Sequence, residues 1–293
     1  MFYKDCTIDN VFKNSVKKFG KNTFLEYPNA EHKKKIKYTY EETNYLVNKY
    51  KKKFFNIGLC CEDRVAIMIG NIPEFFIIKL ALNALGVSTV PLNHELTKTE
   101  LEYQLQHSSS KMIITNNKYL CKFKGIKYIK NNGLCTFDNL VLKWLKYPKL
   151  RKKINKLINP STEASLLYTS GTTGKPKGCI LSHEYEINAG YSYAKKKGLI
   201  SFKVGKERLY NCLPVHHVNS GILSFFAMMI TGNCQIQSER FSVKNFWKEI
   251  NITKATVFHY LGVMAPLLLK NKNNKIEKDN CLRIGVGAGI EPT

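Results

Sequence analysis

The stretch LLYTSGTTGKPKGCILSH, residues 166–183, differs from the sequence on either side of it. Two apolar segments flank a run of small and hydroxyl residues, and this run ends in two lysines separated by a proline. Glycine lets a backbone turn with its amides facing inward, and such concave turns bind anions. The hydroxyl groups add hydrogen-bond donors and the lysines add positive charge. The composition therefore predicts a loop between two strands that binds a polyphosphate.

The spacing in this loop excludes two common phosphate-binding motifs. A Walker A loop requires G-x-x-x-x-G-K-[ST], whereas Gly171 and Gly174 are three residues apart and Pro176 follows Lys175. The dinucleotide fingerprint G-x-G-x-x-G is also absent from this segment. An ordinary glycine-rich hairpin is the alternative interpretation. A hairpin of that kind would not need ten consecutive small, hydroxyl and cationic residues between two apolar strands, so we favour the phosphate-binding loop.

Apolar segments alternate with amphipathic ones along most of the chain. Before the loop, we expect strands at RVAIMIG (64–70), STVPLN (88–93) and KMIIT (111–115). After it, we expect strands at RLYNCLP, NCQIQS, TKATVFHY and LRIGVG, with helices between them. Thr97 and Glu100 predict a capping box at the start of one helix. Strands separated by helices indicate βαβ units, so we expect an α/β fold with two mainly parallel subdomains.

A lysine-rich and weakly patterned region, about residues 117–160, separates the two series of strands. We place a boundary inside it and expect one α/β subdomain over 1–155 and a second over 156–293, the second carrying the phosphate-binding loop. The chain ends soon after the apolar strand in LRIGVGAGIEPT, before any closing helix. We therefore expect it to be the amino-terminal portion of a longer protein.

The chain is strongly basic. It has 46 Lys and Arg residues against 22 Asp and Glu residues, a formal net charge of +24. Such an excess occurs in proteins that bind nucleic acids, membrane surfaces or anionic substrates. The lysines are scattered, however, and their short runs lack the interleaved aromatic residues on which bases stack. We interpret the charge as a solvated surface and expect no nucleic-acid partner.

Cysteine usage and hydropathy indicate a cytoplasmic protein. The nine cysteines are irregularly spaced and include no Cys-x-x-Cys pair, so neither a disulfide framework nor a zinc site is expected. Reduced thiols are typical of the cytosol. The amino terminus has no apolar signal segment, and no run of about 18 apolar residues predicts a membrane span. Peripheral membrane contact and the oligomeric state stay open.

The segment YTSGTTGKPKG, residues 168–178, resembles the phosphate-binding signature of the adenylate-forming (AMP-binding) superfamily. This superfamily includes acyl-CoA synthetases, luciferases and peptide-synthetase adenylation domains. Residues 38–93 resemble its amino-terminal half, and LPVHHVNSG (213–221) is similar to a Pro-x-x-His segment of acyl-CoA synthetases. Residues 253–270 and 282–292 most resemble carnitine/crotonobetaine-type CoA ligases. The implied fold is the amino-terminal domain of this family, ending before its β-barrel and carboxyl-terminal lid domain.

The resemblance implies a ligase of fatty-acid metabolism that uses ATP, Mg²⁺ and coenzyme A. A carboxylic acid would be activated to an acyl-adenylate, and coenzyme A would then displace AMP. The ATP phosphates would be bound by Thr169, Ser170, Gly171, Thr172, Thr173, Gly174, Lys175 and Lys177. The acyl and adenylate pocket would be lined by His217, Val218, Asn219, Gly287, Ala288, Gly289, Ile290 and Glu291. We interpret His216 as a packing residue and leave His259 open between packing and the acyl pocket.

The family's catalytic lysine and its magnesium- and ribose-binding residues would lie beyond Thr293, so we assign no catalytic or metal-binding residue here. We expect little adenylation from this chain alone. One alternative is adenylation that loads a carrier-protein thiol, and another is a non-catalytic nucleotide-binding remnant. A basic nucleic-acid-binding protein is the third. The acyl substrate, a short or carnitine-like acid, rests on the resemblance alone.

Overall fold

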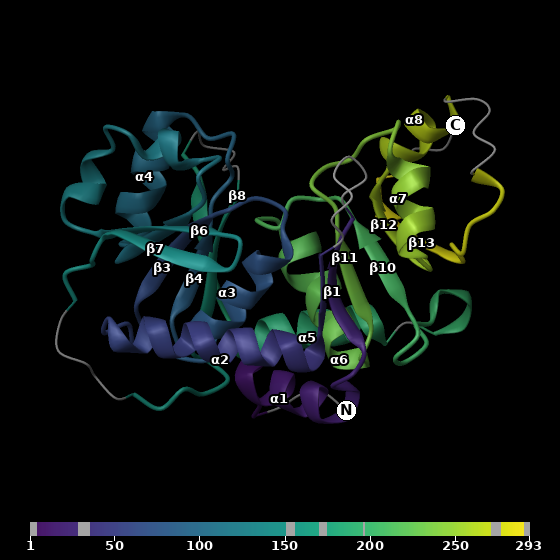
Figure 1. Ribbon diagram of the computed structural model, residues 1–293, viewed down its shortest axis with the longest axis horizontal. Coiled ribbons are helices and arrows are strands. Elements are labelled where there is room, and N and C mark those ends of the chain that lie inside the picture. The colour runs from purple at the N-terminus through teal and green to yellow at the C-terminus, as the bar shows by residue number, and fades with distance from the viewer. Residues whose placement is uncertain are drawn as a thin grey trace. The chain divides into compact units, whose positions relative to one another are not determined.

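The computed structural model divides the chain into two compact units, each built around one β-sheet (Figure 1). The described residues are 5–28, 36–150, 156–169, 175–195, 197–270 and 277–289. The first unit contains residues 1–10, 45–70 and 74–187. The second unit contains residues 11–44, 71–73 and 188–293.

The first unit has a seven-stranded sheet in the order β7-β6-β5-β3-β4-β8-β9. Its strands are β3 (Arg64–Met68), β4 (Ser88–Pro91), β5 (Met112–Thr115), β6 (Gly133–Asp138), β7 (Val141–Lys146), β8 (Glu163–Thr169) and β9 (Lys177–Ser182). Helical segments in this part of the chain are α2 (Tyr40–Asn56), α3 (Pro73–Asn83), α4 (Lys98–Ser108), α5 (His183–Ala194) and the 3₁₀ turns η1 (Leu120–Phe123) and η2 (Lys127–Lys130). The five inner strands are parallel, and β7 and β9 are antiparallel edges.

The second unit has a six-stranded sheet in the order β13-β12-β10-β11-β1-β2, parallel except for β2. Its strands are β1 (Thr23–Tyr27), β2 (Ile36–Thr39), β10 (Arg208–Asn211), β11 (Cys234–Gln237), β12 (Val257–Leu261) and β13 (Ile284–Ala288). The helical segments are α1 (Ile8–Phe19), whose first three residues belong to the first unit, η3 (Gly198–Ile200), the π-helical turn η4 (Asn219–Ser224), α6 (Phe225–Thr231), α7 (Phe246–Thr253) and α8 (Met264–Leu269).

The expected α/β class with two mainly parallel sheets is confirmed. Strands β4 and β5 are buried along their whole length, as parallel strands covered by helices on both faces are. The predicted capping box of α4 is present. The Thr97 side chain accepts a hydrogen bond from the backbone N–H of Glu100, and the Glu100 carboxylate accepts one from the backbone N–H of Thr97.

The structure divides the chain at different places from the expected boundary between 155 and 156. Strand β8 pairs in parallel with β4, so β8 and β9, which flank the glycine-rich loop, complete the first sheet. Strand β1 pairs in parallel with β11, so residues 11–44 belong to the second unit. Both differences come from strand pairings between distant segments, which a weakly patterned linker does not reveal.

A buried ion pair joins the helices and strands of the first unit. The ammonium nitrogen of Lys79, in α3, lies 2.8 Å from Glu186 Oε2 and 3.0 Å from Glu186 Oε1 in α5. The same ammonium donates to the hydroxyl groups of Ser165 (2.6 Å) and Thr89 (3.4 Å), on β8 and β4. Lys79 is 1% exposed and Glu186 is 0% exposed. Burial lowers the pKa of Lys79, whereas the carboxylate of Glu186 opposes this shift.

Replacing one partner of this pair should destabilise the protein strongly. In Lys79→Met the carboxylate of Glu186 stays buried without its cation, and we expect a loss of about 3–5 kcal/mol in the free energy of unfolding. Lys79→Met combined with Glu186→Leu removes both charges and should recover most of that loss. Urea unfolding of the two variants tests this. A single variant within about 1 kcal/mol of wild type would show that the pair is not a structural requirement.

A second buried group ties α5 to the beginning of α1 within the first unit. His183 is 0% exposed, and its Nδ1 accepts a hydrogen bond from the backbone N–H of Ile8 at 3.1 Å. Burial, and to a smaller extent the nearby charge of Lys79, lower the pKa of His183 to about 4. The folded state therefore favours the neutral imidazole, because a protonated Nδ1 cannot accept the Ile8 hydrogen bond.

The protein should lose stability as the pH falls from about 6.5 toward 4. The unfolded chain binds a proton at His183 near the ordinary pKa of about 6.5, whereas the folded chain resists it, so this contribution is complete above that pH. We expect His183 to account for about 2–3 kcal/mol between pH 7 and pH 4.5. His183→Gln should flatten this part of the pH profile, and His94→Gln, at a partly exposed position, should not. Unfolding free energies of both variants, measured across this pH range, test the prediction. Identical slopes for the two variants would refute the assignment of the stability loss to His183.

Candidate functional site

The glycine-rich loop connects two antiparallel strands at one edge of the first sheet. Thr169 at the end of β8 is the register partner of Lys177 at the start of β9. Residues 170–174, which include five of the predicted phosphate-binding residues, lie outside the described residues. Because β8 runs parallel to β4, the loop leaves the carboxyl edge of the sheet. Open α/β sheets bind their ligands at that edge.

The carboxyl-terminal base of the loop is braced by α4. The hydroxyl of Tyr103 donates a hydrogen bond to the carbonyl of Pro176 at 3.2 Å. The ammonium of Lys175 lies 5.9 Å from the centre of the Tyr103 ring, within the range of a cation–π contact. Tyr103 itself stacks on His107, one helical turn further along, with ring centres 5.5 Å apart. Helix α4 therefore holds Lys175 and Pro176 in place directly before β9.

The other side of the hairpin rests on the same helix through Tyr168. Its hydroxyl donates to the carbonyl of Gln104 at 3.2 Å and lies 2.8 Å from His107 Nδ1. Burial raises the pKa of Tyr168 to about 12, so the phenol keeps its proton. With that proton directed to Gln104, the phenol oxygen can accept from the Nδ1–H tautomer of His107. Sequence analysis missed this brace, although an aromatic pair four residues apart on a helix was the available signal.

The predicted residues His217, Val218 and Asn219 lie in the connection that follows β10 in the second unit. The backbone N–H of His217 donates to the carbonyl of Pro214 at 3.0 Å, and the N–H of Gly221 donates to the carbonyl of His217 at 2.9 Å. Asn219 begins the π-helical turn η4. Such turns are rare and occur often at functional sites.

Two amides that sequence analysis did not identify hold this connection in place. Asn71 accepts from the backbone N–H of Val215 at 2.9 Å and donates to the carbonyl of Leu213 at 3.2 Å. Gln237 donates to the same carbonyl at 3.0 Å and accepts from the hydroxyl of Ser220 at 2.8 Å. Neither residue belongs to a motif. Only the folded chain brings them to the connection.

His217 is exposed on this connection, next to His216 at 4.6 Å between ring centres. Desolvation of the covered part of its ring lowers the pKa of His217, which favours the neutral imidazole at pH 7. A neutral imidazole can donate from one nitrogen and accept at the other. This chemistry suits a residue that orients a polar ligand.

Three of the remaining predicted pocket residues, Gly287, Ala288 and Gly289, lie at or directly after the end of β13. Gly287 is the register partner of Tyr260 on β12, and a Cβ at Gly287 would lie 2.3 Å from the Tyr260 carbonyl oxygen. Close packing of the two strands therefore requires glycine there. Gly289 follows with a positive φ of 79°. The side chain of Ala288, together with residues 290 and 291, lies outside the described part of the chain.

Parallel strands bring these two segments to the same edge of the second sheet. β10, β12 and β13 are parallel, so the connection after β10 and Gly289 both follow carboxyl ends, with β12 between them. His259 on β12 is 4% exposed, and its Nδ1 lies 3.0 Å from the hydroxyl of Tyr193. The structure therefore shows His259 as a packed and hydrogen-bonded core residue.

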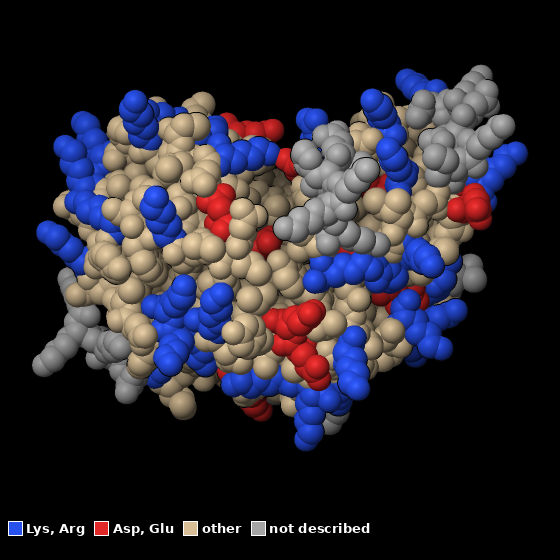
Figure 2. Space-filling model, in the orientation of Figure 1, with Lys and Arg blue, Asp and Glu red and all other residues tan. Residues whose placement is uncertain are grey.

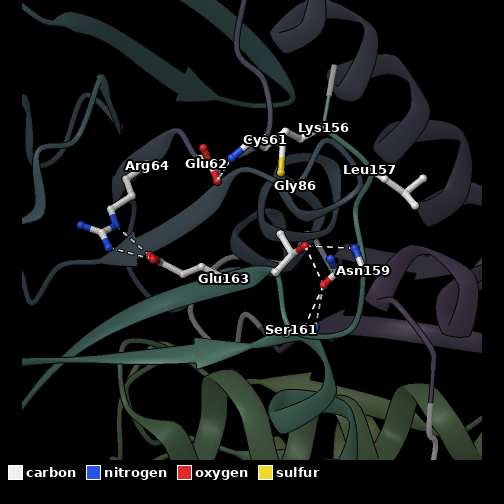
Figure 3. Close-up of a pocket in the computed structure, with 10 residues that line it drawn as sticks. Cys61, Glu62, Arg64, Gly86, Lys156, Leu157, Asn159, Ser161 and Glu163 are labelled. Atoms are coloured by element: carbon white, nitrogen blue, oxygen red, sulfur yellow. Dashed lines mark hydrogen bonds and ion pairs between the residues drawn. The ribbon is translucent and has the colours of Figure 1, made fainter. Parts of the chain in front are cut away.

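A polar pocket of about 540 Å³ lies at the opposite edge of the first sheet (Figure 3). Arg64 and Glu163, the first residues of β3 and β8, form two hydrogen bonds of 2.7 Å across it. Lys156 pairs with Glu62 at 2.6 Å. Each cation therefore already has a carboxylate partner. None of the predicted site residues lines this pocket.

The described residues contain no group of three or more His, Cys, Asp or Glu side chains that could hold a metal ion. Within the same ranges, no helix combines the length and apolar character needed to cross a bilayer. Basic side chains are distributed over the visible face of the molecule, with few acidic ones among them (Figure 2). All nine cysteines are free.

Comparison with known proteins gives matches along nearly the whole chain. The AMP-binding enzyme family model matches residues 12–293. A crotonobetaine/carnitine–CoA ligase of Escherichia coli O17:K52:H18 is 25% identical over 259 residues, which cover 84% of this chain and 49% of the relative. The medium/long-chain-fatty-acid–CoA ligase FadD6 of Mycobacterium tuberculosis is 23% identical over 290 residues, 98% of this chain and 47% of the relative. The chain spans about half the length of these curated relatives.

Solved structures share the fold. O-succinylbenzoate coenzyme A synthetase from Bacillus subtilis, in complex with AMP, aligns with a TM-score of 0.75 and 23% identity, covering 98% of this chain and 68% of that chain. The amino-terminal domain of FACL13 from Mycobacterium tuberculosis aligns with a TM-score of 0.78 and 20% identity, covering 96% and 69%. Since the family model spans all but the first residues, the chain belongs to the AMP-binding enzyme family, and the curated proteins that match it include acyl-CoA ligases.

Proposed function

We propose that this chain forms the ATP- and acid-binding part of an AMP-forming acyl-CoA ligase. The observation that carries the proposal is the β8–β9 hairpin. The hairpin places a glycine- and hydroxyl-rich loop at the carboxyl edge of a parallel sheet. Two lysines stand at the end of this loop. Membership in the AMP-binding enzyme family and the CoA ligases among the relatives support the same reaction.

In the first step, a carboxylate oxygen of the acid bonds to the α-phosphorus of ATP, and the bond to the β-phosphate oxygen breaks. The products are an acyl-adenylate and pyrophosphate. Charge accumulates on the leaving pyrophosphate, so positioned amides, hydroxyls and cations lower the barrier. We assign this task to residues 169–174 together with Lys175 and Lys177. Mg²⁺ would add charge neutralisation at the phosphates. We assign it no ligand in the described residues.

In the second step, a thiol sulfur attacks the acyl carbonyl and AMP leaves. We propose coenzyme A as the thiol. We assign the acyl and adenylate pocket to residues 217–219 and 287–291, with His217 as an orienting group and not a general base. A short or carnitine-like acid is the proposed substrate, supported by the crotonobetaine/carnitine–CoA ligases among the relatives. Free cysteines suit a cytoplasmic location.

Acid-dependent exchange of pyrophosphate into ATP tests the proposal. It should be measured on the natural polypeptide with a panel of carboxylic acids. Exchange followed by thioester formation on coenzyme A supports the ligase. Transfer only to a carrier-protein thiol supports the first alternative, and ATP binding without exchange supports a non-catalytic nucleotide-binding protein. Tight RNA binding with a steep salt dependence and no exchange would identify a nucleic-acid-binding protein.

The two loop lysines should contribute to phosphate binding in particular. Replacing Lys175 and Lys177 together with alanine removes two cations from the triphosphate, and we expect the Kd for ATP to rise about tenfold. Affinity for adenosine, which has no phosphate, should stay within about twofold. Calorimetric titration of both ligands measures the difference. Lys52→Ala with Lys143→Ala, two exposed lysines of the same unit, removes equal charge and is the matched control. Equal losses in the two double variants would mean that the loop lysines act only through net charge.

His217→Ala should weaken acid binding more than it slows the chemical step. We expect the KM for the acid to rise about fivefold, with a smaller change in kcat, because an orienting contact is lost. The kcat profile between pH 7 and 8.5 should keep its shape, since the lowered pKa of His217 favours the neutral imidazole in this range. His216→Ala is the control. Loss of a titration in this range in His217→Ala would instead indicate general-base catalysis.

A further inference from the structure

The lysine-rich segment contains none of the residues that we assign to the ligase reaction. Between residues 117 and 150 the sequence has eight lysines and one aspartate, and no other ionisable acid or arginine. The segment forms the two 3₁₀ turns η1 and η2 and then the hairpin of β6 and β7 at the edge of the first sheet. A pocket lies between the turns and the hairpin.

The floor of this pocket is apolar. Its volume is about 790 Å³, inside the range of about 300–1,000 Å³ that is usual for small-molecule sites. Phe123 and Ile126 are 3% and 4% exposed and belong to the core of the unit. Leu120, Ile129 and Leu134 also line the pocket and are only partly buried. Three aliphatic side chains are therefore left in contact with solvent above a packed base.

The rim of the pocket is positively charged. Lys124 and Lys130 are exposed lining residues, and no carboxylate of the described residues lies within ion-pair distance of either. Lys146 donates to the backbone carbonyls of Ile129, at 2.9 Å, and of Lys130. It thereby fixes η2 against the hairpin and adds its charge to the rim. The polar pocket at the amino ends of β3 and β8 differs, because its cations are paired with glutamates (Figure 3).

We propose that this pocket binds a single-chain amphiphile with an anionic head group. The chain would cover Leu120, Ile129 and Leu134, which removes their apolar surface from water. The carboxylate or phosphate head would lie between Lys124 and Lys130, whose stems can follow the apolar floor while their ammonium groups stay in water. A neutral or cationic amphiphile would make only the apolar contacts with the floor. A free inorganic anion would make only the charge contacts with the lysines of the rim. The proposal is independent of the ligase activity.

The pocket contains its own reporter. Cys121 is exposed and lines it, so a bound chain should shield this thiol from alkylation. Laurate, kept below its micelle concentration, is the probe, and the modification rate of each cysteine is followed by peptide mass spectrometry. We expect laurate at low ionic strength to slow alkylation of Cys121 about fivefold and to lose most of this effect at high salt. Cys281, exposed in the second unit, is the internal reference and should react at an unchanged rate.

Charge-reversal variants separate the proposed site from general binding. Lys124→Glu with Lys130→Glu should weaken laurate protection about tenfold. Lys52→Glu with Lys143→Glu changes the net charge equally at exposed positions outside the pocket. This double variant should retain the protection of Cys121 by laurate. Thermal unfolding midpoints of both double variants confirm that each is folded.

Three probes decide between laurate binding and simpler explanations. Dodecyltrimethylammonium has the same chain with a cationic head, and equal protection by it would overturn the proposal in favour of an unselective apolar surface. Inorganic phosphate tests the head alone, and full protection by it would overturn the need for a chain. Phosphatidylglycerol vesicles test a lipid surface. Protection by vesicles without protection by monomeric laurate would refute the proposed pocket and indicate a membrane-docking face.

Discussion

The buried pair of Lys79 and Glu186 is the constraint on which the arrangement of the first unit depends. Two charges without solvent are costly unless each is paired and hydrogen-bonded, so their partners must be held in register. Here the ammonium of Lys79 also contacts the hydroxyls of Thr89 and Ser165. These hydroxyls belong to β4 and β8, the pair of neighbouring strands that brings the glycine-rich loop into the first sheet. The polar centre of the unit therefore ties β4 to β8, the strand that leads into the loop.

The sequence predicts those features of the fold that depend on short local patterns of residues. Apolar runs bounded by turn residues identified the parallel strands, and Thr97 with Glu100 identified the start of α4, because each signal lies within a few residues. Strand order has no such local signal. Thr89 meets Ser165 across 76 residues, and Leu25 meets Gln235 across a longer span. The division of the chain into units consequently differs from a boundary placed in a weakly patterned linker.

The same limit applies to the candidate site. The residues expected to contact ligand stood out because glycines, hydroxyls and lysines cluster in a few short segments. The residues that hold those segments did not, because amides such as Asn71 and Gln237 are common and act only where the fold places them. Tyr103 and His107 are intermediate, since their spacing marks one face of a helix but not the hairpin that this face supports. The supporting residues are therefore found from the structure, whereas the residues expected to contact ligand are predictions from the sequence.

Glycine at the end of β13 shows why a motif match and a structural explanation have to be separated. Gly287 lies in the segment that we assigned to the adenylate pocket from the resemblance, yet a Cβ at this position would clash with the Tyr260 carbonyl oxygen, which already excludes any side chain there. Packing alone therefore accounts for the residue type. Packing does not explain the direction of β13. Its carboxyl end lies at the same edge of the second sheet as the connection that carries His217. Gly287 and Gly289 can offer a ligand at this edge only their backbone, whereas the connection after β10 offers the side chains of His217, Val218 and Asn219. Specificity for the acid should accordingly be sought in residues 217–219 before it is sought in the glycines.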